Sequence, residues 1–157
     1  MNQRVYIETT VISYLAARTN RDVIIKAHQE VTRAWWLRRR KDFELIVSDV
    51  VLEELGRGDK PAAERRMSYA QNLNSVLITE PAIALARLLL KQKAVPAVAQ
   101  VDALHIGIAA AHGADYLLTW NCRHIANAEM RAKIGAVCRN VGYEPPVICT
   151  PEELMGD

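Results

Sequence analysis

Cysteine is scarce in this sequence, and net charge is almost absent. The three cysteines, Cys122, Cys138 and Cys149, include no C-x-x-C pair, and their number is odd. This pattern argues against a disulfide framework and against a structural zinc site, so we expect three free thiols. The formal net charge of +2 does not by itself indicate a strongly acidic or basic partner.

Long apolar segments are also missing. No apolar run reaches the roughly 20 residues that a membrane-spanning helix needs. The first residues carry charges at Arg4 and Glu8 in place of the apolar core of a secretion signal. No G-x-G-x-x-G segment follows the first apolar run, which argues against a dinucleotide-binding domain. We therefore expect a cytoplasmic protein that makes no contact with a membrane.

The composition is that of an ordinary globular domain. The chain has 157 residues, of which 50% are hydrophobic and 24% are charged. This length suits one domain with a sizeable core. We expect a single domain over residues 1–150, followed by a short C-terminal tail over residues 151–157.

Short β-branched runs alternate with longer segments of helical periodicity. Strands that are separated by helices pair in parallel through right-handed crossovers. The pattern therefore predicts an α/β fold, a three-layer α/β/α sandwich with a central, mainly parallel sheet of four to five strands. The predicted strands are 4–8, 43–48, 75–78, 115–119 and 145–149. The predicted helices are 20–42, 49–55, 60–73, 80–95, 99–113 and 124–142.

The long predicted helix over residues 20–42 carries an apolar stripe and a basic end. The basic block from Arg38 to Lys41 has two interpretations. It is either a solvated helix end, where cations suit the helix dipole, or a surface for nucleic acid or an acidic partner. We favour the first. The stripe that is expected to face the core consists of Ile24, Ala27, Val31, Ala34, Trp35 and Leu37.

Acidic residues follow the predicted strands at the end where open parallel sheets gather functional groups. Glu8 ends the first strand, with no basic residue beside it. Glu54 lies on the short helix after the second strand, and Asp102 lies in the first turn of the helix before the fourth strand. Each has an ordinary explanation: an arginine partner or a helix cap for Glu8, a surface position for Glu54, and a favourable helix N-terminus for Asp102.

Taken together, the three acids predict a metal site. Carboxylates that converge without basic partners repel one another, and a divalent cation relieves that repulsion. Mg²⁺ and Mn²⁺ prefer hard oxygen ligands and are commonly held by one or two carboxylates plus water. Such a site leaves coordination positions for a phosphodiester and an attacking water.

Three stretches in order resemble the motifs of one family, the PIN-domain ribonucleases, and most of all its VapC-type toxins. They are VYIETTVISYL (5–15), VSDVVLEEL (47–55) and DALHIGIAAAHGADYLLTWN (102–121). The resemblance implies an Mg²⁺- or Mn²⁺-dependent ribonuclease of a toxin–antitoxin pair, whose products carry a 5′-phosphate and a 3′-hydroxyl. It also implies an RNA substrate, a small antitoxin partner and a homodimer.

The resemblance assigns roles to individual residues. It aligns Glu54 rather than Glu53 with the second acid, and it makes Asp102 the acid that we favour as acceptor of a proton from water. This sequence has Glu8, Thr10 and Asn121 where the family usually has Asp, Asn and Asp. The implied catalytic residues are Glu8, Glu54, Asp102 and Asn121, with the first three as metal ligands and with Thr119, Thr10 and His124 orienting the substrate.

Two other functions remain open from the sequence. Because Glu8 and Asn121 depart from the family pattern, the chain could be a catalytically weak or inactive PIN-like module that binds RNA or protein. A phosphotransfer enzyme with an aspartyl nucleophile is disfavoured, since "ETT" (8–10) contains no Asp. Two aromatic side chains near the acids also have two interpretations. His105 either contacts the site or packs beside the sheet, and Trp120 either stacks on a base or packs at the rim; we favour packing for both.

Overall fold

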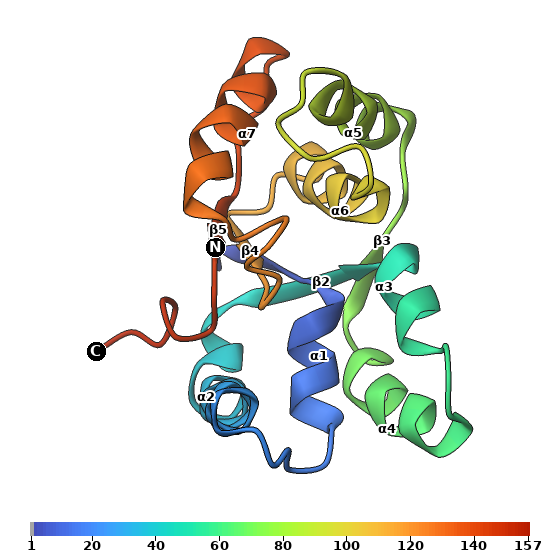
Figure 1. Cartoon of the computed structure of the whole chain (residues 1–157), viewed down its shortest axis with the longest axis vertical. Coiled ribbons are helices and arrows are strands. Elements are labelled where there is room, and N and C mark those ends of the chain that lie inside the picture. The colour runs from blue at the N-terminus through green and yellow to red at the C-terminus, as the bar shows by residue number, and fades with distance from the viewer. Residues whose placement is uncertain (1) are drawn as a thin grey trace.

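The computed structural model describes residues 2–157 and has a central sheet with helices on both faces (Figure 1). Its strands are parallel and lie in the order β3-β2-β1-β4-β5. The predicted three-layer α/β/α sandwich is therefore confirmed. The strands are β1 (Arg4–Ile7), β2 (Glu44–Ser48), β3 (Asn74–Val76), β4 (Tyr116–Leu118) and β5 (Val147–Cys149). The helices are α1 (Thr9–Ala16), α2 (Val23–Arg39), α3 (Asp49–Leu55), α4 (Lys60–Ala70), α5 (Glu80–Lys91), α6 (Gln100–Ala111) and α7 (Ala128–Asn140), with a 3₁₀ turn η1 (Arg40–Asp42).

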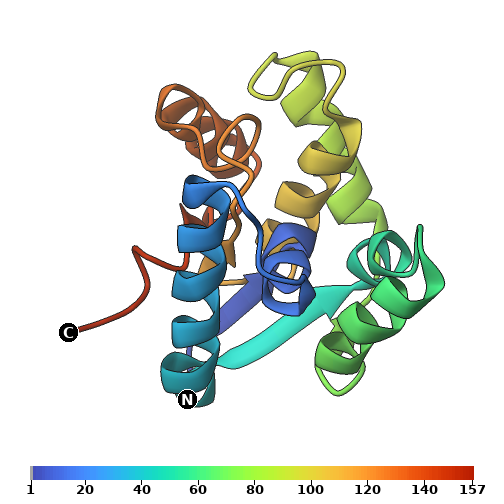
Figure 2. The same ribbon diagram turned by 60° about the horizontal axis from the view of Figure 1, so that its bottom comes forward.

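The helices are divided between the two faces of the sheet. Helices α5, α6 and α7 cover one face, and α1, α2 and α4 lie on the other, as both ribbon views show (Figures 1 and 2). Helices α5 and α6 approach closely at Gly107, where a Cβ atom would lie 2.5 Å from the carbonyl oxygen of Ala82. A glycine is therefore required at this helix crossing.

Strand β1 lies at the centre of the sheet, between β2 and β4. Its residues Val5, Tyr6 and Ile7 are fully buried, as expected for a parallel strand that is covered on both faces. The backbone N–H of Glu8 continues the ladder by donating to the carbonyl of Leu118 at 3.0 Å. The end of the central strand therefore delivers the Glu8 carboxylate to the carboxyl edge of the sheet.

The predicted apolar stripe of α2 is wrong at three positions, Ile24, Ala27 and Leu37, which are exposed. Ile24 is 68% exposed and Leu37 is 76% exposed. The buried face of α2 consists instead of Gln29, Thr32, Trp35 and Trp36. Two of these are polar, and each is satisfied by hydrogen bonds: Gln29 binds backbone groups of Arg18 and Asn20, and Thr32 accepts the indole N–H of Trp120. An apolar pattern cannot identify a helix face on which polar residues are buried with partners.

Several element ends differ from the prediction. Strand β3 ends at Val76, and α5 ends at Lys91, just before Lys93, which has a positive φ of 59°. Helix α7 begins at Ala128 because the side chain of Asn127 caps it, accepting the N–H of Glu129. Within residues 2–157, no helix combines the length and apolar character needed to cross a lipid bilayer.

The three thiols differ in exposure, and part of the C-terminal segment packs against the domain. All three cysteines are free, as predicted: Cys122 is exposed, whereas Cys138 and Cys149 are buried. In the segment predicted as a tail, Leu154 is buried, and its carbonyl accepts the indole N–H of Trp35 at 3.2 Å. Residues after 150 therefore contact α2.

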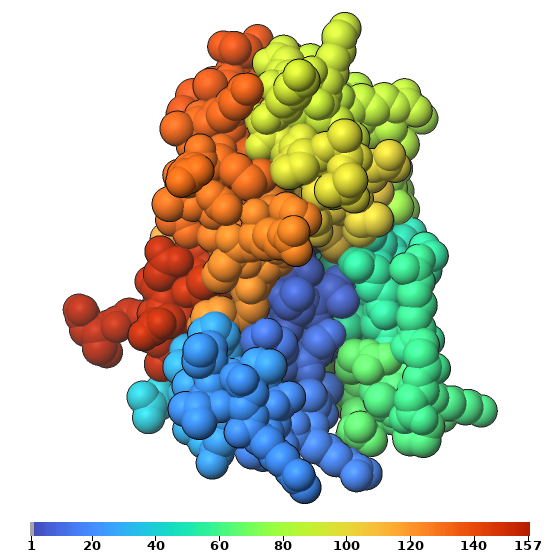
Figure 3. All heavy atoms as spheres, viewed as in Figure 1, coloured from blue at the N-terminus to red at the C-terminus, as the bar shows by residue number. Residues whose placement is uncertain are grey.

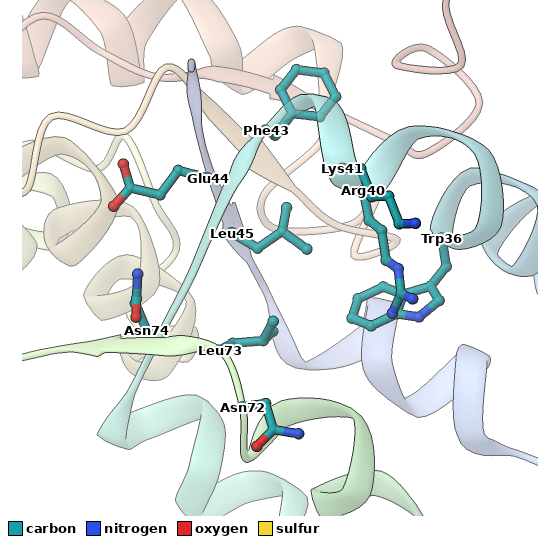
Figure 4. Close-up of a pocket in the computed structure, with 9 residues that line it drawn as sticks. All are labelled: Trp36, Arg40, Lys41, Phe43, Glu44, Leu45, Asn72, Leu73 and Asn74. Atoms are coloured by element: carbon teal, nitrogen blue, oxygen red, sulfur yellow. The ribbon is translucent and has the colours of Figure 1, made fainter. Parts of the chain in front are cut away.

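A hollow of about 360 Å³ lies at the amino ends of β2 and β3, away from the predicted acids (Figure 4). The guanidinium of Arg40 lies over the ring of Trp36 there, 5.1 Å from its centre. Arg39 pairs with Asp42 at 3.0 Å, so two of the four cations in the predicted basic block are engaged within the chain. The other lining residues are Lys41, Phe43, Glu44, Leu45, Asn72, Leu73 and Asn74.

Candidate active site

The carboxyl ends of β1, β2 and β4 bring the predicted residues to one edge of the sheet. Glu8 follows β1, Glu54 lies on α3 directly after β2, and Asn121 follows β4. Asp102 lies in the first turn of α6. In Figure 3, blue atoms from the beginning of the chain border orange atoms from the segment after β4 on the face in view. We call Glu8, Glu54, Asp102 and Asn121 the acid edge.

Glu8 is almost completely buried, with 3% exposure. Its Oε1 accepts hydrogen bonds from the hydroxyls of Thr10 and Thr119, and its Oε2 accepts one from the backbone N–H of Thr10 at 3.1 Å. No arginine or lysine pairs with it among the described residues. The carboxylate caps α1, one of the ordinary explanations that the sequence left open.

Asp102 is joined to Glu8 through a series of hydrogen bonds. The Asn121 backbone N–H donates to the Thr119 hydroxyl at 2.9 Å, and the Asn121 side-chain amide donates to Asp102 Oδ1 at 3.0 Å. Asp102 Oδ2 lies 3.2 Å from Nδ1 of His124. Glu8, Thr119, Asn121, Asp102 and His124 therefore form one connected set, which we call the Thr119 series.

Glu54 occupies a different environment. Its Oε1 accepts the hydroxyl of Thr9 at 2.7 Å and lies 2.7 Å from Nε2 of His105. Its Oε2 has no hydrogen-bond partner among residues 2–157. Glu53 points to solvent and pairs with Arg57 at 2.7 Å. Of the two adjacent glutamates, only Glu54 reaches the strand ends.

The environment of Glu54 favours its ionised form. Burial alone would raise its pKa, but the hydrogen bonds from His105 and Thr9, together with favourable electrostatics of His105 and Arg57, outweigh burial. The pKa of Glu54 is consequently lowered from its ordinary value. The carboxylate is therefore ionised at neutral pH, with one oxygen unpartnered.

His105 makes specific polar contacts that the favoured packing interpretation did not include. It is 1% exposed, and its Nδ1 lies 2.8 Å from the hydroxyl of Tyr6, which in turn lies 2.7 Å from the Ser48 hydroxyl. The spacing of Asp102 and His105 on one helix face was the only sequence signal for this contact. Tyr6 gave none, because it lies within an apolar strand pattern.

Trp120 packs at the rim and does not present a stacking surface. It is 8% exposed, and its ring stacks on His28 with a centroid separation of 4.0 Å. Its indole N–H donates to Thr32, and its backbone N–H donates to the Thr10 hydroxyl. The packing interpretation of Trp120 is therefore correct.

The acid edge carries negative charge without strong cationic partners. Its only ion-pair partners among the described residues are His105 and His124. Within residues 2–157, no three His, Cys, Asp or Glu side chains are grouped as a direct metal-binding set. The predicted ligands Glu8, Glu54 and Asp102 therefore share an edge and a hydrogen-bonded setting, but they do not form a three-carboxylate cage.

Comparisons with known proteins identify the fold. No protein-family model and no curated protein matches the sequence. VapBC2 from Rickettsia felis, bound to a DNA fragment from its promoter, matches with a TM-score of 0.57 and 16% identity over 94% of this chain and 98% of that one. VapC20 from Mycobacterium tuberculosis, a toxin that cleaves the sarcin–ricin loop, matches with a TM-score of 0.59 and 14% identity over 82% of this chain and 94% of that one. VapBC-1 from nontypeable Haemophilus influenzae matches with a TM-score of 0.58 and 15% identity over 96% of this chain and 99% of that one.

These identities are low, but the matches span 82–96% of this chain and 94–99% of the other chains. The element order and the parallel sheet agree with the resemblance that the motifs indicated. The chain therefore has the PIN-like fold of the VapC toxins.

Proposed function

We propose that this protein is a Mg²⁺- or Mn²⁺-dependent ribonuclease and the toxin of a toxin–antitoxin pair. One observation carries the proposal. Three carboxylates and Asn121 lie at the carboxyl edge of a PIN-like sheet, and no arginine or lysine forms an ion pair with them among the described residues. This is the edge at which open parallel sheets bind their ligands.

The donor set suits a hard cation. Oε2 of Glu54 is unpartnered, and the side chains of Glu54 and Asp102 are 27% and 20% exposed. Mg²⁺ commonly takes only one or two carboxylates and fills its other positions with water, so a three-carboxylate cage is not required. Glu54 and Asp102 would hold the ion, and Glu8 would contribute through its charge or through water. When bound, the cation neutralises phosphate charge and lowers the pKa of a bound water.

The side chains of the acid edge would perform the remaining steps. Asp102 accepts the proton of the attacking water at a carboxylate oxygen. Asn121 holds Asp102 through its amide, and His124 lies beside the same carboxylate, where it would contact the phosphate. Thr10 and Thr119 hold Glu8, which keeps its charge close to the site.

An arginine-lined hollow beside α1 supports an RNA substrate. The hollow has a volume of about 210 Å³, and Arg18, Arg65 and Arg66 line it together with Ser13. None of the three arginines forms an ion pair within residues 2–157. Ser13 lies one helical turn beyond Thr9, which donates to Glu54, so α1 connects the acid edge to this basic surface. RNA phosphates would occupy it.

The structural neighbours support the proposal of an antitoxin partner. Two of the structural relatives are VapBC assemblies. We propose that this chain likewise binds a small antitoxin protein in the cytoplasm and forms a homodimer. Co-expression with a short reading frame found next to its gene, followed by size-exclusion chromatography with light scattering, tests both assemblies.

The decisive experiment is cleavage of single-stranded RNA. The wild type is expected to cleave in Mn²⁺ or Mg²⁺, to stop in EDTA, and to lose activity in Asp102→Asn. Glu53→Gln is the matched control, because Glu53 is an exposed acid adjacent to Glu54 in sequence. No cleavage and no metal binding by the folded wild type would favour the other function, an inactive PIN-like binding module.

A further inference from the structure

A row of three buried polar groups lies beneath Glu54. The Ser48 hydroxyl lies 2.7 Å from that of Tyr6, the Tyr6 hydroxyl lies 2.8 Å from Nδ1 of His105, and Nε2 of His105 lies 2.7 Å from Glu54 Oε1. Ser48, Tyr6 and His105 are each at most 1% exposed. We call Ser48, Tyr6, His105 and Glu54 the His105 series.

The hydrogen bonds of this series have one direction in which every group is satisfied. An ionised Glu54 can only accept, so Nε2 of His105 donates to it, and the other nitrogen of a neutral imidazole then accepts. The Tyr6 hydroxyl must donate to that nitrogen and accept from Ser48. The Ser48 oxygen also accepts the backbone N–H of Val51 at 3.5 Å.

The opposite direction leaves a buried donor without an acceptor. If Nδ1 of His105 donated to Tyr6, the Tyr6 hydroxyl would have to donate to Ser48. No further acceptor for the Ser48 hydroxyl occurs among the described residues. Leaving a buried donor unsatisfied costs more than a typical hydrogen bond contributes, which is enough to select the first direction.

The His105 series connects the elements that carry the acids. Tyr6 belongs to β1, Ser48 ends β2, Glu54 lies on α3, and His105 lies on α6 one turn after Asp102. His105 therefore ties the carboxylate of Glu54 to the helix that carries Asp102. Only Oε1 of Glu54 is used, which leaves Oε2 without a partner.

We propose that His105, supported by Tyr6 and Ser48, is a positioning residue of the proposed ribonuclease, fixing Glu54 so that its Oε2 stays available to a hard cation or its water. This inference rests on the proposed function. A packing role alone would not require these hydrogen-bonding groups, since replacing hydrogen-bonded partners by apolar groups of similar shape can be nearly neutral for stability. Phenylalanine would fill the position of Tyr6 in a central strand.

Substitutions along the series test the role. Tyr6→Phe keeps the ring and removes the hydroxyl, and His105→Leu removes both nitrogens. Groups that orient metal ligands typically contribute about 10- to 100-fold to metal affinity or activity. We expect kcat and Mn²⁺ affinity to fall about 10-fold in Tyr6→Phe and about 100-fold in His105→Leu, with KM for RNA within about twofold. His105→Gln, whose amide can still donate to Glu54, should recover part of both losses.

A matched control separates positioning from stability. Gln29→Met also removes a buried hydrogen-bonding side chain, but Gln29 contacts only backbone groups near the start of α2. It should lower the unfolding midpoint without changing kcat or Mn²⁺ affinity. Nitrogen-15 NMR of wild-type His105 should show the proton on Nε2, and this reading does not depend on activity.

The possible outcomes separate a failure of the positioning role from a failure of the proposed function on which it rests. A folded wild type without cleavage or metal binding overturns the proposed function and the positioning role together. An active wild type whose kcat and Mn²⁺ affinity are unchanged in His105→Leu overturns the positioning role alone. A proton on Nδ1 of His105 overturns the direction of the series. If Tyr6→Phe or His105→Leu fails to fold, His105→Gln and the NMR reading still decide.

Discussion

Glu8 and Glu54 are the same residue type at the same edge of the sheet, but they lie in opposite environments. Glu8 is 3% exposed, and neutral donors occupy both of its oxygens. The Glu54 side chain is 27% exposed, with one oxygen unpartnered and the other joined to a buried histidine. Burial with complete hydrogen bonding makes Glu8 a fixed charge that anchors α1. Partial exposure makes Glu54 a group that can still bind a ligand.

The Thr119 series and the His105 series extend this difference. Hydroxyls and an amide join Glu8 to Asp102, whereas an imidazole and a phenol hold Glu54 from below. The two series meet on α6, where Asp102 and His105 are one turn apart. One helix therefore sets the spacing between the exposed acids of the edge.

The largest expected effect is at Asp102. Replacing it by Asn keeps the shape and most of the contacts but removes the proton acceptor. General base groups contribute about 10²- to 10⁴-fold, so kcat for RNA cleavage should fall by that factor in Asp102→Asn. Single-turnover cleavage in Mn²⁺ measures the change, with Glu53→Gln as the control. A loss of less than about threefold would remove Asp102 from the mechanism.

The next largest effect is a difference in the free energy of unfolding between Glu8→Gln and Glu54→Gln. In Glu8→Gln, an amide NH₂ that faces the threonines removes the acceptor of their hydroxyl hydrogens, and the opposite orientation sets a donor against the Thr10 N–H. Leaving such a group unsatisfied costs about 1–3 kcal/mol in the free energy of unfolding. Glu54→Gln can still accept from Thr9 and His105 through one oxygen, so its loss should be smaller. Urea unfolding at neutral pH measures both, and equal losses would contradict the comparison.

The arginine-lined hollow predicts an intermediate effect on RNA binding. Arg18→Ser with Arg65→Ser should weaken binding of single-stranded RNA and reduce the salt dependence by about 0.7 in log–log slope for each lost phosphate contact. Arg38→Ser with Lys41→Ser is the matched control, because it removes the same amount of charge. Both residues are exposed and lie at or just after the C-terminal end of α2, whereas Arg18 precedes that helix. Equal weakening by both pairs would indicate binding by general charge and not by the hollow.

A smaller effect concerns pH. The pKa of Glu54 is lowered in the folded protein: burial opposes this shift, and hydrogen bonds from His105 and Thr9 with nearby positive charge produce it. A lowered folded pKa contributes stability that is present above the unfolded pKa and is lost as pH falls through the folded value. Wild type should therefore lose more stability on acidification than Glu54→Gln. Urea midpoints from neutral to acid pH measure this, and parallel curves would contradict the assignment.

The smallest effect is a change in thiol reactivity that reports on the acid edge. Cys122 is exposed next to Asn121, whereas burial raises the pKa of Cys138 to about 11 and of Cys149 to about 12. A thiol reagent should therefore modify Cys122 alone in the native protein. Single-stranded RNA should slow this modification, and an unchanged rate with saturating RNA would place RNA away from the edge.

The sequence predicted the fold and the acid edge because both depend on order along the chain. Helix α3 was predicted with its correct ends, and the acids were expected where the strands end. The polar part of the buried face of α2 was not predicted, because Gln29 and Thr32 are buried through hydrogen bonds that depend on other segments. The partners of His105 were missed for the same reason, since Tyr6, Ser48 and Glu54 meet it only in three dimensions.

The most direct test of the central claim is anomalous diffraction from crystals soaked in Mn²⁺. The account predicts a peak at the carboxyl edge of the sheet, within ligand distance of Glu54 Oε2 or Asp102 and absent in Asp102→Asn with Glu54→Gln. A folded crystal with no peak there at saturating Mn²⁺, or with the only peak elsewhere, would contradict the claim.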